Sequence, residues 1–345
     1  MLCLQESYYT ITNRLINPYM PRKISYCLLS ILVCSHPLFA EEIIDEQSVD
    51  EELLTVDPGP VDTAVVEEQP VIEPDPVDSE CTRIGNKLGS VNYEECMDRN
   101  LIASNGMSVL GAPILYKEYP PLLERRQPLG RVLLIGGIHG DEYSSVSIVF
   151  KWMRTLDRYH SGLFHWHIIP LLNPDGLLRK QSQRMNANNV DLNRNFPMQD
   201  WENITQEYWI NTTNRNPRRF PGDSPLSEPE SSWLVREIND FQPDIIVSVH
   251  APHGVIDYDG PEDGPYKLGK LYLQLVGTYP GSLGNYAGVQ RKIPVVTIEL
   301  PYAGIMPSPS EISNIWTDLV RWLSENIQIN PYNVALDDPD YLSGD

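Results

Sequence analysis

Positive charge is scarce in this sequence. It has 26 Lys and Arg residues against 47 Asp and Glu residues, and its formal net charge is −21. Such a chain repels the phosphate backbone of nucleic acids, so we expect no nucleic-acid partner. Internal repeats are also absent, and the length of 345 residues allows one large domain or two ordinary ones with a sizeable core.

Long hydrophobic runs are missing too. The apolar stretch at residues 24–34 is shorter than the roughly twenty apolar residues that cross a bilayer. It follows two basic residues and precedes Ala40, which is the order of charge, apolar core and small residue in a secretory signal. We therefore predict a signal peptide over residues 1–40, with Met20 as a possible true start, and a periplasmic or secreted bacterial protein with no stable membrane span after processing. An N-terminal membrane anchor is the alternative.

Cysteine is rare. Three of the five cysteines lie within the first 34 residues, so a processed chain keeps only Cys81 and Cys96. Two cysteines at this spacing in an exported protein predict a disulfide, which closes a loop worth about 3 kcal/mol. Two buried free thiols are the alternative. A structural zinc site is not expected from two thiols, because such a site has four ligands.

Residues 41–80 lack both aromatic and basic residues, and they contain fifteen acidic ones. Such a stretch buries too little apolar surface to offset the entropy lost on ordering. We therefore predict a disordered acidic linker that acts as a spacer. One folded domain is expected over residues 81–328, followed by an acidic tail over residues 329–345.

From residue 81 onward, apolar runs alternate with amphipathic segments. The apolar runs are continuous, which is typical of strands buried on both faces of a sheet. The predicted fold class is therefore α/β, with a mixed, largely parallel sheet and helices on both faces. Ser227 and Glu230 have the spacing of a capping box at the start of one helix. Strands are expected at residues 131–138, 164–172, 243–249 and 293–299, and helices at residues 144–156, 228–241 and 310–326.

Metal-ligating and acidic residues follow three of these strands. His139 and Glu142 come directly after the first strand, and a His and a carboxylate three positions apart can both bind one zinc ion. His250 and Glu299 end two later apolar runs. Since open α/β sheets place their sites at the carboxyl ends of their strands, we expect these residues to meet.

The order of these motifs resembles that of the zinc carboxypeptidase superfamily, from about Leu110 to Trp322. His-x-x-Glu is followed by Val-Asp-Leu-Asn-Arg-Asn-Phe, then by Ser-Val-His and Thr-Ile-Glu-Leu. Within the superfamily, the chain resembles in particular the bacterial murein peptide amidase A group, which cuts the bond between γ-D-glutamate and diaminopimelate. The motifs that carry this resemblance are Asn173-Pro-Asp-Gly176, Arg184-Met-Asn-Ala-Asn188, Phe220-Pro-Gly222, Ser227-Glu-Pro-Glu230, His250-Ala-Pro252 and Pro280-Gly-Ser-Leu-Gly284.

The resemblance implies a zinc peptidase domain with one zinc ion per chain. Water would fill the fourth position of the metal, and a carboxylate would take its proton and later protonate the leaving amine. An Arg would face the oxyanion, and an Asn-Arg pair would hold the terminal carboxylate of the substrate. The residues in these roles are His139, Glu142 and His250 as zinc ligands, Glu299 as general base, Arg184 at the oxyanion, Asn193 and Arg194 at the carboxylate, and Asp191 as the partner that fixes the tautomer of His139.

The chain departs from the digestive carboxypeptidases in two places. Their mobile Tyr would fall at Val276, while Tyr279 and Tyr286 are off register, so neither receives a role. The segment that follows Arg184 is shorter than in those enzymes, which makes Arg179 an alternative residue at the oxyanion.

Several other His and Arg residues belong to no motif. His165 and His167 lie two apart on one strand and could pass for a metal pair, but packing is the expected role. His253 lies beside the site. The stretch at residues 203–219 is expected to be an exposed loop over the active site. Its arginines are Arg215, Arg218 and Arg219. They are expected either to contact acidic groups of a peptide substrate or to be solvated.

The expected activity is zinc-dependent hydrolysis of the γ-D-glutamyl-meso-diaminopimelate amide bond in murein peptides. A zinc carboxypeptidase acting on ordinary peptides and an acylamino-acid deacylase of the aspartoacylase type are the enzymatic alternatives. A catalytically silent binding module of the same fold is disfavoured by the intact Glu299. The sequence indicates no oligomeric state.

Overall fold

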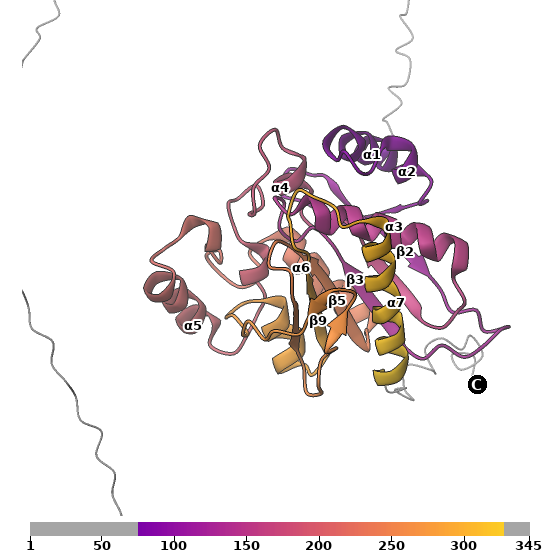
Figure 1. The fold of residues 1–345 in the computed structure, drawn as a ribbon. Coiled ribbons are helices and arrows are strands. Elements are labelled where there is room, and N and C mark those ends of the chain that lie inside the picture. Colours follow the sequence, from indigo (N-terminus) through magenta and orange to yellow (C-terminus); the bar gives the residue numbers. More distant parts are fainter. Residues whose placement is uncertain (1–74, 328–345) are drawn as a thin grey trace, which may run out of the picture. The chain divides into compact units, whose positions relative to one another are not determined.

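Seven strands form one mixed sheet in the computed structural model, which describes residues 75–327 (Figure 1). The strand order is β1-β2-β4-β3-β5-β9-β6. A separate pair of short strands, β7 and β8, is antiparallel. The strands are β1 (Ile102–Met107), β2 (Pro113–Tyr119), β3 (Arg131–Ile135), β4 (His165–Ile169), β5 (Ile245–His250), β6 (Ile256–Asp259), β7 (Lys267–Leu268), β8 (Leu271–Tyr272) and β9 (Val295–Glu299).

The four central strands, β4, β3, β5 and β9, are parallel to one another. The outer pairings, β1 with β2, β2 with β4, and β6 with β9, are antiparallel. The predicted α/β class with a mixed sheet is confirmed. Each of the four predicted strands is present, and the carboxyl ends of all four lie at the same edge of the sheet because the strands are parallel.

Helices cover both faces of this sheet. Successive strand residues point to opposite faces, so Leu134 lies in one apolar cluster with α3 and α7, while Leu133 lies in another with α6 and η4. Burial on both faces explains the continuous apolar runs of the sequence. The helices of the two faces are α3 (Tyr143–Tyr159), α6 (Pro229–Phe241), η4 (Gly284–Gln290) and α7 (Pro309–Asn326).

The first helix begins inside the stretch that was expected to be linker. Asp75 caps helix α1 (Pro76–Lys87) by accepting a hydrogen bond from the Val77 N–H, and proline occupies the first turn. Glu80 is buried rather than solvated. The helix therefore occupies the last five residues of the expected linker 41–80, because its apolar face packs on the domain. The rest of that linker, the predicted signal peptide and the predicted tail lie outside the described residues.

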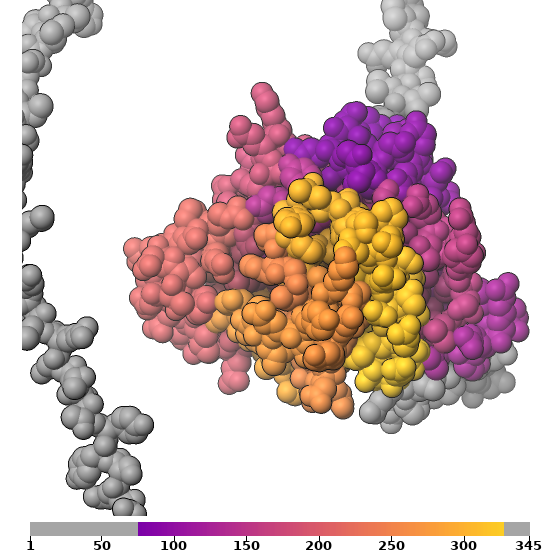
Figure 2. Space-filling model, in the orientation of Figure 1, coloured from indigo at the N-terminus to yellow at the C-terminus, as the bar shows by residue number. Residues whose placement is uncertain are grey.

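A disulfide joins the first two helices of the described residues. Cys81 of α1 and Cys96 of α2 (Tyr93–Met97) are bonded, with their Cα atoms 5.4 Å apart, and both are fully buried. The predicted pairing is therefore present, and the alternative of two free thiols is wrong. In the space-filling view the indigo residues of this segment cover the upper edge of the described part of the chain (Figure 2). No helix within residues 75–327 is long and apolar enough to cross a membrane.

The capping box predicted at the start of α6 (Pro229–Phe241) is absent. The N-cap of α6 is Glu228 and has no side-chain capping bond. Ser227 Oγ donates instead to Glu228 Oε1, at 2.8 Å, because Glu230 is buried and faces Asn186. The remaining short elements connect the sheet to the site, and they are α4 (Pro174–Leu178), η1 (Leu192–Arg194), α5 (Trp201–Glu207), η2 (Tyr208–Thr212) and η3 (Pro217–Arg219).

Candidate active site

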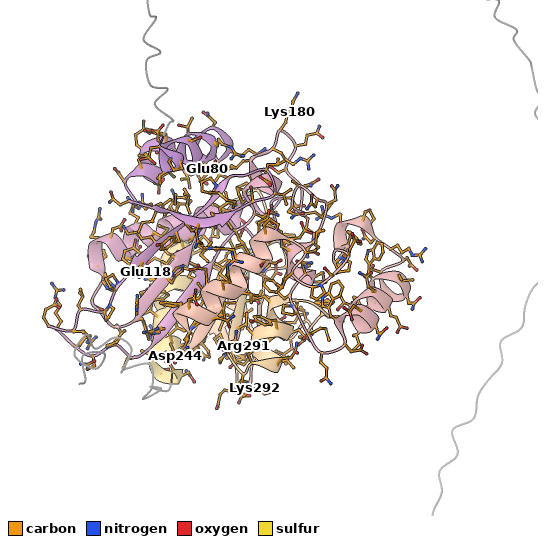
Figure 3. The ribbon with its side chains drawn as sticks, turned by 180° about the vertical axis from the view of Figure 1, so that it is seen from behind. Glu80, Glu118, Lys180, Asp244, Arg291 and Lys292 are labelled. Carbon is orange, nitrogen blue, oxygen red and sulfur yellow. A yellow bond between two sulfur atoms is a disulfide. The ribbon has the colours of Figure 1, made fainter. Side chains whose placement is uncertain are left out.

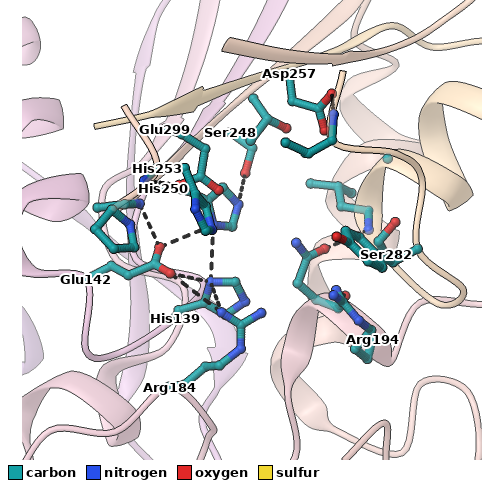
Figure 4. Close-up of a pocket in the computed structure, with 18 of the residues that line it drawn as sticks. His139, Glu142, Arg184, Arg194, Ser248, His250, His253, Asp257, Ser282 and Glu299 are labelled. Carbon is teal, nitrogen blue, oxygen red and sulfur yellow. Dashed lines mark hydrogen bonds and ion pairs between the residues drawn. The ribbon is translucent and has the colours of Figure 1, made fainter. Parts of the chain in front are cut away.

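Two histidines and a glutamate converge at the carboxyl ends of β3 and β5 (Figure 4). The Nδ1 atoms of His139 and His250 lie 3.1 Å apart. Glu142 places Oε1 2.8 Å from His139 Nδ1 and Oε2 3.2 Å from His250 Nδ1. All three residues are buried, and among the described residues they are the only group of this kind able to hold a metal ion.

The Nε2 atom of each histidine forms a hydrogen bond with another side chain. His139 Nε2 lies 3.1 Å from Asp191 Oδ1, and His250 Nε2 lies 3.0 Å from Ser248 Oγ. These bonds orient both rings so that the two Nδ1 atoms face Glu142. Two imidazole nitrogens and one carboxylate are the donor set of a catalytic zinc site. In such sites each histidine ring is also oriented by a hydrogen bond to its other nitrogen, as observed here. The residues present therefore fit zinc.

The buried carboxylates of the site are stabilised in their charged form. Burial raises the pKa of Glu142, but the neighbouring His139 and His250 hold it well below its usual range. Burial likewise raises the pKa of Asp191, and Arg184 and His139 outweigh this effect. Both groups therefore stay ionised and able to act as a ligand and as a hydrogen-bond acceptor.

Glu299 ends β9 directly beside His250. The parallel pairing of β5 with β9 sets His250 opposite Glu299, so their side chains leave the same face of the sheet. Glu299 lines the same pocket as the three metal donors. Its Oε2 accepts a hydrogen bond from the backbone N–H of His253 at 3.4 Å. The predicted general base thus lies next to the metal donors.

Close backbone contact brings Arg184 to the metal donors. A Cβ atom on Gly140 would lie 2.2 Å from the carbonyl carbon of Gly176, so only glycine allows these two loops to touch. The Gly140 N–H donates to the Arg184 carbonyl, and Asn173 Nδ2 donates to the same oxygen. The glycines and the asparagine of these motifs therefore place the Arg184 segment beside His139.

The Arg184 side chain lines the pocket and faces the metal donors. Its Nε donates to Asp191 Oδ2 at 2.8 Å, and its Nη1 lies 3.6 Å from Glu142 Oε1. Arg179 is exposed and is absent from the pocket wall. Of the two candidates for the oxyanion role, Arg184 therefore lies beside the metal donors and Arg179 does not.

Asn193 and Arg194 line another side of the pocket, where Arg194 adds a positive charge. Asn193 Oδ1 accepts a hydrogen bond from the Leu283 N–H at 2.8 Å, which fixes this side chain in the pocket wall. The Arg194 guanidinium lies 4.5 Å above the ring centre of Tyr279, and burial lowers the pKa of Arg194 to about 10. Tyr279, which the sequence left without a role, thus holds the guanidinium of a predicted substrate-binding residue.

Two acidic residues close the far end of the pocket, whose volume is about 450 Å³. Asp257 and Asp259 lie two apart on β6 and so share one face of the sheet. In the strand register, Asp257 lies opposite Thr297, and Thr297 lies opposite Ser248. These three polar residues therefore form one row across the sheet, which leads from the metal donors to the acids. Burial raises the pKa of Asp257 and of Asp259. No cationic side chain of residues 75–327 forms an ion pair with either.

Comparison with known proteins agrees with this geometry. The family model described as zinc carboxypeptidase matches residues 102–260. Murein peptide amidase A of Vibrio campbellii is 36% identical over 205 residues, which make up 57% of this chain and 78% of that protein. Murein peptide amidase A of Escherichia coli is 33% identical over 224 residues, or 63% of this chain and 88% of that protein. This chain belongs to the zinc carboxypeptidase family.

The fold is also shared with a solved structure of low sequence identity. The crystal structure of carboxypeptidase A from Helicoverpa armigera aligns with a TM-score of 0.52 at 18% identity, covering 68% of this chain and 71% of that one. The prediction of a metallopeptidase that uses zinc is confirmed by the family and by the donor set. Glu299 lies outside the range of the family match, so its place in the site rests on the strand register.

The other histidines of the strands are not part of this zinc carboxypeptidase site. His165 and His167 of β4 lie beside Glu118, which Figure 3 labels on the reverse side of the molecule. His167 also stacks on Tyr116, with ring centres 4.9 Å apart, and packs against Phe241. The expected packing role is therefore observed, and the two rings belong to no three-residue metal cluster among the described residues.

Proposed function

We propose that this protein is an exported zinc amidase that hydrolyses the γ-D-glutamyl-meso-diaminopimelate amide bond in murein peptides. The observation that carries the proposal is the convergence of three metal donors, the Glu299 carboxylate and Arg194 in one pocket. Two relatives at 36% and 33% identity bear the name murein peptide amidase A, which supports murein peptides as the substrate.

The proton transfers follow from the positions of these groups. His139, Glu142 and His250 would hold the zinc ion, which supplies Lewis acidity at the scissile carbonyl. Glu299 accepts a proton from the attacking water and later delivers it to the leaving amine. The carboxylate is thereby restored when the carbon–nitrogen bond has broken, so it acts in every turnover without being consumed.

Arginine side chains of the pocket stabilise the negative charges of the substrate in this proposal. The Arg184 guanidinium stabilises the negative charge that develops on the carbonyl oxygen. Asn193 and Arg194 bind the carboxylate of the residue that is released, with Arg194 able to form a bidentate pair. The Leu283 N–H, which donates to Asn193, and the Tyr279 ring, which lies under the Arg194 guanidinium, fix the two side chains before substrate arrives.

The acidic end of the pocket supports diaminopimelate as the released residue. Its side chain ends in an ammonium and a carboxylate, and Asp257 and Asp259 offer a counter-charge for the ammonium. An apolar side chain would leave the buried Asp257 and the half-buried Asp259 without a counter-charge, which is unfavourable. These acids therefore favour a cationic side chain over that of an ordinary hydrophobic residue.

Export is supported by two features. Residues 1–40 have the pattern of a secretory signal, and the disulfide between Cys81 and Cys96 is typical of oxidising compartments. In this proposal the protein reaches the periplasm or the outside of a bacterial cell, and the mature chain begins near Glu41. Sequencing the N-terminus of the protein recovered from its host tests this; an intact residue 1–40 segment on a cytoplasmic protein contradicts it.

Product analysis tests the proposed reaction. The purified protein is loaded with zinc and incubated with L-Ala-γ-D-Glu-meso-diaminopimelate and with the matched peptide in which the D-glutamate is α-linked. We expect free diaminopimelate from the γ-linked peptide and little from the α-linked one. Faster release from the α-linked peptide would instead identify an ordinary carboxypeptidase.

A further inference from the structure

One side of the catalytic pocket is formed by the short helix η3. Arg218 and Arg219 of this helix line the pocket together with the metal donors. Arg215, on the same segment, is exposed and does not line it. The structure thus separates the three arginines that the sequence left undecided between substrate contact and solvation.

Two contacts fix η3 to the catalytic loops. Arg218 Nη2 lies 2.8 Å from Asp141 Oδ2, and Asp141 directly precedes Glu142. On the other side, the Phe220 carbonyl accepts a hydrogen bond from the Asp191 N–H at 2.8 Å. Arg219 lies between these two attachments, so its backbone is held at the rim of the pocket.

The Arg219 guanidinium itself has no hydrogen bond or ion pair with any described residue. It is half-buried, and it lies close enough to Arg194 for its positive charge to lower the pKa of Arg194. Burying a guanidinium near another one, without a counter-ion, is unfavourable. A group of this kind in a catalytic pocket is suited to an anion that arrives with the substrate.

The proposed substrate brings two carboxylates close to the scissile amide. One belongs to the released residue and is assigned above to Arg194. The other is the α-carboxylate of the γ-linked glutamate, which stays free because the chain continues through the side chain. An ordinary α-linked peptide has no such group at this place.

We propose that Arg219 binds the free α-carboxylate of the γ-glutamyl residue on the acyl side of the scissile bond. This inference rests on the proposed function and adds the residue that selects γ-linked substrates. Arg219 acts on binding and orientation, while proton transfer stays with Glu299. The bound carboxylate supplies the counter-charge that the guanidinium lacks in the free protein.

The test compares two γ-linked peptides that differ only in this carboxylate. The first is L-Ala-γ-D-Glu-meso-diaminopimelate, and the second carries D-isoglutamine, in which the α-carboxylate is an amide. A charge-assisted bidentate contact predicts that the native protein prefers the acid by about ten- to a hundredfold in kcat/KM. Arg219→Gln should bring that preference close to one, mainly by slowing cleavage of the acid.

Arg215→Gln is the matched control, because it removes the same charge from the same segment outside the pocket. It should keep the native preference, and Arg219→Lys should keep part of it. Zinc content and thermal midpoint are measured for each variant, so that misfolding is recognised. Arg219→Gln that slows both peptides equally, or Arg215→Gln that abolishes the preference, would overturn the inference.

Failure of the wider proposal gives a different result. If the native protein cleaves neither γ-linked peptide, the proposed function falls and Arg219 has no such role. If it cleaves the acid and the amide equally well, the function stands and only the inference about Arg219 is wrong.

Discussion

The two ends of the catalytic pocket differ in how their charges are satisfied. At the metal end, Asp191 contacts both His139 and Arg184, and Ser248 supports His250. At the outer walls, Arg219, Asp257 and Asp259 line the pocket without any ion pair within the described part of the chain. Asp257 and Asp259 accept hydrogen bonds from Val276 and Thr278, so they lack a counter-charge but not polar partners. In the proposed function the groups at the metal end are preorganised, whereas Arg219 and the two acids gain their counter-charges from the substrate.

The largest effect should come from removing the proposed base at the metal end. Glu299→Gln keeps the shape of the side chain but cannot accept a proton, so kcat should fall about 10²- to 10⁴-fold. Steady-state kinetics on the γ-linked peptide and elemental analysis for zinc measure the two consequences separately. The zinc content should not change.

His250→Ala is the matched variant for this experiment, because it removes a predicted ligand and should lose zinc together with activity. Undiminished zinc in that variant would remove His250 from the metal site. A zinc-loaded Glu299→Gln protein with native kcat would remove Glu299 from its role as base.

A smaller effect is expected outside both ends of the pocket. The disulfide joins two helices that contribute no side chain to the pocket wall. Replacing Cys81 and Cys96 together by serine should lower the free energy of unfolding by about 3 kcal/mol, with zinc content and the pH profile of kcat unchanged. Denaturant titration checks the first expectation, and loss of zinc at native stability would contradict the second.

The smallest effect should appear behind the pocket. Burial raises the pKa of Glu230 to about 7, from an ordinary value of 4.5. The folded state therefore binds the proton more tightly than the unfolded state does. This contribution to stability is complete below about pH 4.5 and is lost as the pH rises through about 7.

Glu230→Gln removes that dependence. The difference in unfolding free energy between variant and native protein should shift by about 2 kcal/mol in favour of the variant from about pH 5 to about pH 7.5. Denaturant titrations at both pH values measure this shift. Because the comparison is between two pH values, any constant loss of hydrogen bonds to Val109 and Asn186 cancels. A difference that does not vary with pH would refute the assignment.

The sequence predicts the metal end better than the walls. His139, His250 and Glu299 could be found because each follows an apolar run, and parallel strands end at one edge of the sheet. Asp257 lies on a strand of four residues, which is too short to show a pattern of alternating polarity. Its place beside Thr297 and Ser248 becomes visible only when β6 is paired with β9. Strand pairing is a property of distant segments, and spacing along the chain does not encode it.

The loop residues were harder still to assign. Tyr279 is off register for the tyrosine of the digestive enzymes, yet its ring lies under the Arg194 guanidinium. The capping box expected at Ser227 fails because α6 directs Glu230 inward. In both cases a contact with a distant part of the chain determines what the side chain does, and the neighbouring sequence does not reveal that contact.

The pairing of β5 with β9 has a consequence for how such a protein can change. His250 and Glu299 are neighbours through backbone hydrogen bonds, although the intervening chain forms β6 to β8 and η4. Insertions and deletions in the loops between these elements leave the spacing of the proposed ligand and base untouched, since the strand register sets it. A slip of one residue in β9 would instead turn the base to the opposite face of the sheet. The loops are thus free to evolve new specificities while the reaction geometry is inherited intact.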